Sequence, residues 1–291
     1  MRILPILDRL KLTLVNKFAP APQPSIETLG FPPFSARIRD RHRRWWTEGQ
    51  SHLLKSIGGK SEGQEYMRAL GYQVPELYAK LDKITDLPEL SDLPPRLILK
   101  PNGGYSVQNV FPIESGRNLI DKTRLSRAAI IAKVGKAGLQ PFVVEELLQH
   151  YDGRPGLPFD YKFNCFGSRI ATINVVERNS LTNVHLNRYW FLTPDWTHPP
   201  FRVSNHYYPE RTIPPQPDCL DDMLMLVRDV GARLNCFVRI DLYATTRGPV
   251  FGEFTAFPTM GYGYTPEAEA FFGRMWQGLE GCLKRPEGTC D

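Results

Sequence analysis

Apolar positions follow two spacings along this chain, and together they predict a mixture of helices and strands. Helical spacing covers residues 37–57, 62–70, 121–136, 219–234 and 266–283. Period-two or continuous apolar runs predict strands over residues 72–75, 96–100, 107–113, 142–148, 160–166 and 169–177. The strands follow one another as hairpins, one of them turning at Gly167–Ser168, so an α+β fold with antiparallel sheets is expected.

Residues 238–255 predict the most informative hairpin, two β-rich runs around a Thr-Arg-Gly-Pro turn. If the turn is symmetric about its arginine, Asp241 lies opposite Glu253 and Arg239 opposite Thr255. All four then project from one face of the hairpin. Facing carboxylates repel one another unless a cation lies between them, and oxygen ligands of this kind suit Mg²⁺. A solvated face with an arginine–carboxylate pair is the alternative.

Charge is concentrated in one segment near the start of the chain. The 291 residues carry a net charge of +5, and residues 37–44, with five Arg and one Asp, supply +4 of it. A general nucleic-acid-binding surface is therefore not indicated. The basic run precedes Trp45 and Trp46, and it fits a solvated helix face, or a contact with phosphates, an acidic partner or a membrane surface. Residues 1–18 are too interrupted by charges for a signal peptide or a membrane span.

The cysteines and histidines of the chain form no recognisable metal or catalytic pattern. Cysteines occur at five scattered positions, Cys165, Cys219, Cys236, Cys282 and Cys290. Their number and spacing fit free thiols in a reducing cytosol, and we therefore expect a cytoplasmic protein. The six His residues form no zinc or triad signature.

A lysine followed by a glycine loop is the first candidate for phosphate binding. Lys100 ends a predicted strand, and the loop that follows it contains Asn102, Gly103, Gly104 and Ser106. Glycine lets backbone amides approach phosphate oxygens closely, and lysine supplies a compact charge. An ordinary turn is the alternative, because many turns contain Asn-Gly.

Two strands carry charged side chains at positions where a partner is needed. Glu145 and Glu146 are neighbours in an apolar strand, so one of them points inward and requires a ribose hydroxyl, an Arg or a Lys. Lys162 is in the middle of another strand, where it either meets an anion or extends its stem to solvent at an edge.

The order of these motifs resembles that of the ATP-grasp superfamily, and their residues are similar to those of the TupA-like ATP-grasp family. That family is tied to bacterial polysaccharide and teichuronopeptide biosynthesis. The resemblance spans about residues 58–280, and its matching phrases are residues 59–78, 93–102, 160–167, 237–243, 251–255 and 256–266.

The resemblance implies an ATP-grasp fold, in which two α+β subdomains with antiparallel sheets enclose the nucleotide. The implied organisation is a basic helical extension at 1–57, a lead-in region at 58–95, a lid subdomain at 96–148 and a metal-binding subdomain at 149–285.

The resemblance also assigns roles to the candidate site residues. Lys100 and Lys162 would contact the phosphates of ATP under a mobile loop of Asn102, Gly103, Gly104 and Ser106. The adenine side is the alternative place for Lys162. The adenine-side strand would be Glu145, Glu146, Leu147 and Leu148, with one Glu facing the ribose. Asp241 and Glu253, with Thr255 at a third position where many relatives have Asn, would bind one or two Mg²⁺ or Mn²⁺ ions. Arg239 would steady the transferred phosphoryl group.

The implied activity is an ATP-dependent carboxylate–amine ligase that works through an acyl phosphate, with small-molecule or glycan-linked substrates of the cell surface. A kinase acting on a sugar or lipid hydroxyl is one alternative. A non-catalytic nucleotide- or glycan-binding relative is the other, with Trp190, Trp196, Tyr207 and Tyr208 either stacking on a ligand or packing. Arg178, Arg188 and His206 could bind an anionic substrate. The basic segment leaves open an association with the inner face of the membrane, and the oligomeric state stays unassigned.

Overall fold

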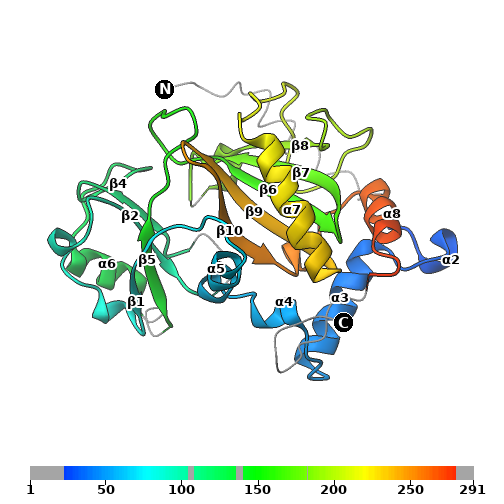
Figure 1. The fold of residues 1–291 in the computed structure, drawn as a ribbon, viewed down its shortest axis with the longest axis horizontal. Helices are drawn as coiled ribbons and strands as arrows, with labels where there is room; N and C mark the ends of the chain where they lie inside the picture. Colours follow the sequence, from blue (N-terminus) through cyan, green and yellow to red (C-terminus); the bar gives the residue numbers. More distant parts are fainter. Residues whose placement is uncertain (1–22, 104–107, 136–139, 182, 280–291) are drawn as a thin grey trace.

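A computed structural model describes residues 23–103, 108–135, 140–181 and 183–279 of the chain. Two five-stranded antiparallel sheets form its framework, with helices packed around them (Figure 1). The expected α+β class with two antiparallel sheets is confirmed.

The first sheet is built from the N-terminal half of the chain. Its strand order is β1-β5-β2-β3-β4. Its elements are β1 (Leu77–Leu81), β2 (Arg96–Pro101), β3 (Phe111–Glu114), β4 (Arg117–Asn118), β5 (Phe142–Glu146), the helix α6 (Arg127–Val134) and the short helices η1 (Ile84–Asp86) and η2 (Leu90–Asp92). These elements enclose a small core of their own around Leu99 and Phe142. The sheet includes β1, which lies within the segment 58–95 that the resemblance sets apart as a lead-in.

The second sheet is larger and forms the centre of the molecule. Its strand order is β10-β9-β6-β7-β8. Its strands are β6 (Asp160–Phe166), β7 (Arg169–Glu177), β8 (Arg188–Leu192), β9 (Phe237–Thr245) and β10 (Gly248–Thr255). Helix α7 (Leu220–Leu234) lies across one face of this sheet (Figure 1). A Cβ added at Gly231 of this helix would lie only 2.2 Å from the Gly167 carbonyl oxygen. The close approach of the helix to the turn therefore requires glycine at position 231.

The remaining helices lie around the second sheet, most of them at the end where β9 begins (Figure 1). They are α2 (Ile26–Leu29), α3 (Phe34–Trp46), α4 (Leu53–Ser56), α5 (Lys60–Ala69), α8 (Pro266–Met275), η4 (Val184–Leu186) and η5 (Pro258–Gly261). Phe34 of α3 is buried in an aromatic cluster, where its ring contacts those of Phe166, Phe237, Tyr264, Phe272 and Trp276. None of the helices in the described part of the chain has the length and apolar character that crossing a bilayer requires.

The basic run of α3 is not a uniformly solvated face. Arg41 is 4% exposed and lies inside the core, while Arg43 and Arg44 pair with Asp40 near the surface. Trp45 is buried and Trp46 is exposed.

Several expected elements differ from the observed ones for identifiable reasons. The helix expected over 37–57 ends at Trp46, and only a short second helix, α4, follows. Residues 72–75 form no strand. The helix expected from 121 begins after Ser126, which caps it, because Asp121 accepts hydrogen bonds from Thr123 and closes a turn instead. The last helix ends at Met275. Strand β8 was not expected, because both of its faces are largely buried and it shows no alternation.

Candidate functional site

A cavity of about 560 Å³ is lined by residues of both sheets. From the side of the first sheet come Ile98 and Lys100 of β2, the β5 end and Lys60 of α5. From the second sheet come side chains of β6 to β10, together with the segment that follows β10. Five cationic and five anionic side chains line this cavity, so the charges balance within a wall that is otherwise largely apolar.

The β9–β10 hairpin places Asp241 opposite Glu253 and Arg239 opposite Thr255, as the sequence predicts. The reason differs from the one expected, because the turn is not symmetric about Arg247. Thr245 pairs with Gly248, and this register alone would leave Asp241 out of line with Glu253. A bulge between Phe251 and Glu253 shifts the register by one residue and brings the two carboxylates together.

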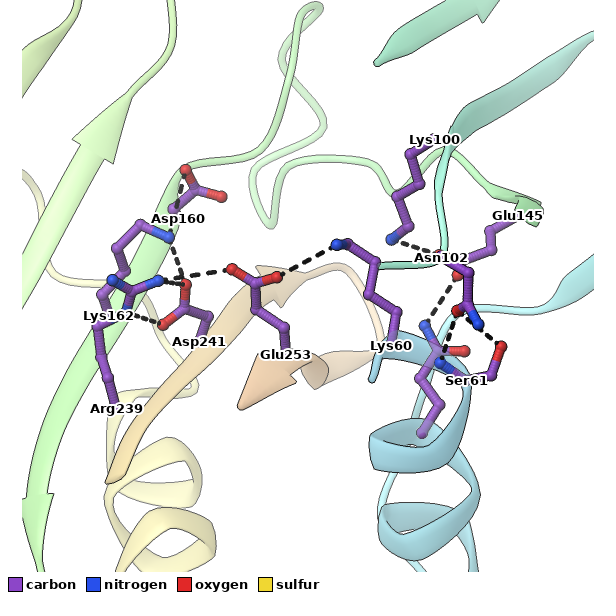
Figure 2. A network of polar contacts seen from close by, with 11 residues as sticks. Lys60, Ser61, Lys100, Asn102, Glu145, Asp160, Lys162, Arg239, Asp241 and Glu253 are labelled. Carbon is purple, nitrogen blue, oxygen red and sulfur yellow. Dashed lines mark hydrogen bonds and ion pairs between the residues drawn. The ribbon is translucent and has the colours of Figure 1, made fainter. Parts of the chain in front are cut away.

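Asp241 is held between two cations at the centre of the site (Figure 2). Arg239 donates two hydrogen bonds of 2.7 Å to its carboxylate, and Lys162 of β6 forms an ion pair with it. Burial alone would raise the pKa of the Asp241 carboxyl, but these two charges outweigh burial and hold that pKa well below its usual range. Asp241 is therefore an ionised carboxylate in a buried position.

Glu253 connects the two sides of the cavity. Its carboxylate lies 3.5 Å from Arg239 Nη2 and 3.7 Å from Lys60 Nζ, and its side chain is 34% exposed. Lys60 is the first residue of helix α5, and burial lowers the pKa of its ammonium group even though Glu253 opposes that effect. Lys60 is a cavity residue that was not predicted from the sequence. Its signal is the Gly-Lys-Ser phrase immediately before a helix.

Lys100 projects toward the cavity from β2 and pairs with Glu145 of β5. The two side chains are 2.6 Å apart, and Gln64 of α5 donates a 3.0 Å hydrogen bond to the same carboxylate. Glu145 is fully buried, whereas Glu146 pairs with Arg247 of the other sheet at 2.6 Å. The expectation that one of the two glutamates points inward is therefore correct.

The glycine loop begins beside the N-terminus of α5. The side-chain oxygen of Asn102 accepts hydrogen bonds from the backbone N–H (3.1 Å) and the hydroxyl (3.0 Å) of Ser61. These bonds satisfy part of the unpaired donor set at the start of α5 and tie that helix to the end of β2. Gly103 is exposed, and the expected loop residues Gly104 and Ser106 lie outside the described residues.

Leu147 and Leu148 follow β5 and line the cavity as buried side chains. Next to them, Asp160 pairs with Arg178 at 2.6 Å and lies 3.9 Å from Lys162. Burial and the Asp160 charge raise the pKa of Tyr243, which also lines this part of the cavity.

Two of the four aromatic residues considered for ligand stacking are packed in the core. Trp190 and Trp196 are buried in the core, and Tyr208 is exposed. Tyr207 lines the cavity and stacks on Tyr189 with ring centroids 4.3 Å apart.

The other residues considered for anion binding differ in their placement. Arg178 lines the cavity. Arg188 pairs with Glu177 and Glu210 near the surface, and His206 is exposed.

The donor set fits a divalent ion that is shared with phosphates. Asp241 and Glu253 offer carboxylate oxygens on one face, and Mg²⁺ is commonly bound by one or two carboxylates together with substrate phosphates. No group of three or more His, Cys, Asp or Glu within the described ranges could hold a metal by itself. Thr255 pairs with Arg239 across the hairpin and is buried, but it does not line the cavity.

Comparisons with known proteins identify one family and several solved structures that are similar to this chain. The model of the TupA-like ATP-grasp family matches residues 55–273, and no curated protein matches the chain. The D-alanine–D-alanine ligase of Bacillus anthracis is 14% identical, with a TM-score of 0.48 over 77% of this chain and 67% of that one. The VanG D-Ala:D-Ser ligase of Enterococcus faecalis is 15% identical, with a TM-score of 0.45 over 76% and 61%. The L-amino acid ligase of Bacillus licheniformis is 12% identical, with a TM-score of 0.41 over 79% and 50%. The chain thus spans one half to two thirds of the length of these structures.

Proposed function

This chain belongs to the TupA-like ATP-grasp family, and on that premise we propose that it is an ATP- and Mg²⁺-dependent carboxylate–amine ligase. The observation that supports this most directly is the pair of facing carboxylates, Asp241 and Glu253, in a cavity that also contains Lys60, Lys100, Lys162 and Arg239. Carboxylates for a metal and cations for phosphates are the two ingredients of a phosphoryl-transfer site.

Each cation of the site has a role in holding the triphosphate. Lys60 and Lys100 approach from the side of the first sheet, and Lys162 and Arg239 approach from the second. Their charges would bind the β- and γ-phosphates from both sides, and Glu145 would orient Lys100 as it does in the structure. When Mg²⁺ is bound, it neutralises phosphate charge, with Asp241 and Glu253, the two carboxylates that line the cavity, as the proposed ligands.

The reaction follows from this arrangement. A substrate carboxylate attacks the γ-phosphorus of ATP, releases ADP and becomes an acyl phosphate. The amine of a second substrate then attacks the acyl carbon, phosphate leaves, and the amine gives a proton to solvent as the amide forms. Arg239 is placed to hold the transferred phosphoryl group, and closure of the cavity would keep water away from the acyl phosphate.

The biological setting that we propose is modification of cell-surface polysaccharide or peptide on the cytoplasmic side of the membrane. It rests on the resemblance of the sequence motifs to those of the TupA-like family. The two substrates would each be a small molecule or linked to a glycan.

The Asp241→Asn variant tests the proposed role of the carboxylate pair. We expect Mg²⁺-dependent ATP turnover to fall by about 10²- to 10³-fold, the size of effect seen when one electrostatic group of an active site is removed. Glu253→Gln should act in the same direction with less loss of stability, because Glu253 is partly exposed. Asp221→Asn on the exposed first turn of α7 is the control and should be neutral. Full turnover by Asp241→Asn would exclude the proposed metal site.

The products distinguish ligation from a kinase reaction at the same site. Free phosphate that appears only when an amine is added, with an equal amount of amide, supports the ligase. A stable phosphorylated product without any amine supports a kinase.

A further inference from the structure

Arg41 is a buried arginine on α3, outside both the cavity and the residues that the family model matches. Its guanidinium lies over the ring of Trp276, 4.2 Å from the centroid, and near the ring of Trp45 at 5.4 Å. A buried charge costs free energy unless its donors are used, so such a residue needs a structural reason.

Two hydrogen bonds of Arg41 end on the hairpin that carries the site. Its Nη1 donates to the carbonyl oxygen of Phe237 at 2.8 Å and to that of Ala256 at 3.4 Å. Phe237 is the first residue of β9, and Ala256 directly follows the last residue of β10. One guanidinium nitrogen therefore joins both strands at the open end of the hairpin.

This open end lies next to the site residues. The last paired positions of the ladder are Arg239 and Thr255, two residues from Phe237 and one from Ala256. The same helix also holds the next cavity residue, because the Phe257 ring packs against Trp45 with centroids 5.2 Å apart.

We propose that Arg41 is a positioning residue that clamps the open end of the β9–β10 hairpin and thereby sets the separation of Arg239, Asp241 and Glu253. The catalytic part of this proposal rests on the proposed function, whereas the clamp itself does not. Arginine suits the position, because its planar fork can donate to separate acceptors while its faces stack on aromatic rings. Lysine concentrates its charge on one flexible ammonium and cannot reproduce both features.

The test compares Arg41→Met with Glu269→Met in the full-length chain. Glu269 also anchors α3, by accepting a 2.8 Å hydrogen bond from the Ser35 backbone N–H, but it does not touch the hairpin. Amide hydrogen exchange over residues 237–241 and 253–257 is measured first. We expect exchange there to rise by about tenfold in Arg41→Met, through local opening of the strand ends, and to stay near wild type in Glu269→Met.

The second readout is calorimetric binding of the ATP analogue AMP-PNP with and without Mg²⁺. A misplaced carboxylate pair should abolish most of the Mg²⁺-dependent gain in affinity. Metal-free binding should fall much less, because two of the phosphate-binding cations, Lys60 and Lys100, lie on other elements. A variant that only lowers stability would shift the melting temperature, but the ratio of AMP-PNP affinities with and without Mg²⁺ would stay unchanged. If Arg41→Met does not fold, Arg41→Lys replaces it. We then expect a smaller rise in amide exchange and a smaller loss of the Mg²⁺-dependent gain in affinity.

The proposed clamp would be overturned by a folded Arg41 variant in which the hairpin amides exchange at the wild-type rate and Mg²⁺ increases AMP-PNP affinity as much as in the wild type. Equal increases in exchange for Arg41→Met and Glu269→Met would overturn it too, because loosening of α3 would then explain both. If the wild-type protein does not bind AMP-PNP, the proposed function fails, and the exchange measurement still decides whether Arg41 holds the hairpin.

Discussion

Lys60 illustrates how single residues of the site depend on their surroundings. Its ammonium group is largely removed from water, and burial lowers its pKa although Glu253 lies 3.7 Å away. A lysine with a lowered pKa loses its charge at a lower pH than an exposed one. A phosphate-binding role would therefore depend on pH in the alkaline range.

We expect nucleotide affinity to fall on the alkaline side before the ordinary lysine pKa of 10.5 is reached. Below the lowered pKa, Lys60 is charged and attracts phosphate, and above that pKa the attraction is lost. Lys60→Arg should keep its affinity over the same range, because arginine stays protonated. Calorimetric titration with AMP-PNP from neutral to alkaline pH measures both. Identical pH profiles for the two proteins would remove Lys60 from phosphate binding.

The sequence identifies most candidate residues of the site but not all of them. Asp241, Glu253 and Lys162 carry charges at strand positions that need partners, and Lys100 precedes a glycine loop. The structure brings all four to one cavity. Lys60 was missed, because a lysine at a helix start is usually solvated. Only the tertiary arrangement turns it toward Glu253.

Among the elements, the β9–β10 hairpin shows how a register can be predicted correctly from an incorrect turn. The pairing of Asp241 with Glu253 was derived from a turn centred on Arg247, but the ladder begins with Thr245 and Gly248. The bulge at Gly252 supplies the missing residue. An added Cβ there would lie 3.0 Å from the Tyr243 ring and 3.1 Å from the Asp241 carbonyl oxygen.

We therefore expect Gly252→Ala to reduce Mg²⁺-dependent ATP turnover by about tenfold, through displacement of Asp241 relative to Glu253. Gly248→Ala is the matched control. Its φ of +93° strains alanine and costs about 1 kcal/mol of stability, but it lies at the turn and should leave turnover per folded molecule unchanged. Steady-state kinetics with thermal melts separates the two effects. If both variants lose turnover equally, the bulge has no special role.

Local signals explain which other elements could be predicted. Strands β6 and β7 have the bounds expected from the sequence, because alternation and the Gly167 turn are both local. The start of α6 was placed too early, since helical spacing from residue 121 hid the turn that Asp121 forms with Thr123. The position of β1 in the first sheet depends on long-range pairing with β5, which no local pattern encodes.

At the scale of the whole molecule, the described part of the chain contains two hydrophobic cores of unequal size, one in each sheet region. Polar contacts connect the regions, including Arg247 with Glu146 at 2.6 Å and the Gln64 side-chain amide with the Glu145 carboxylate at 3.0 Å. The cavity lies between them and takes side chains from both. A bound nucleotide would therefore couple the two cores.

We expect two thermal transitions in calorimetry of the free protein, the lower one belonging to the first sheet with its smaller core. AMP-PNP with Mg²⁺ at about 100 times its dissociation constant should stabilise the lower transition by about 2.7 kcal/mol, because the ligand binds only when both sides are folded. The two transitions should then approach each other. An unchanged lower transition would mean that the first sheet does not contribute to the nucleotide site.

The aromatic cluster around Phe34 determines how a protein truncated at its N-terminus would behave in solution. Phe34 fills the space between Phe237 and Trp276, although it precedes the segment shared with the family. A fragment starting at residue 55 would leave these rings facing water. Such a surface favours self-association, so the poor solubility of a shortened protein would reflect an uncovered core rather than an unstable catalytic fold.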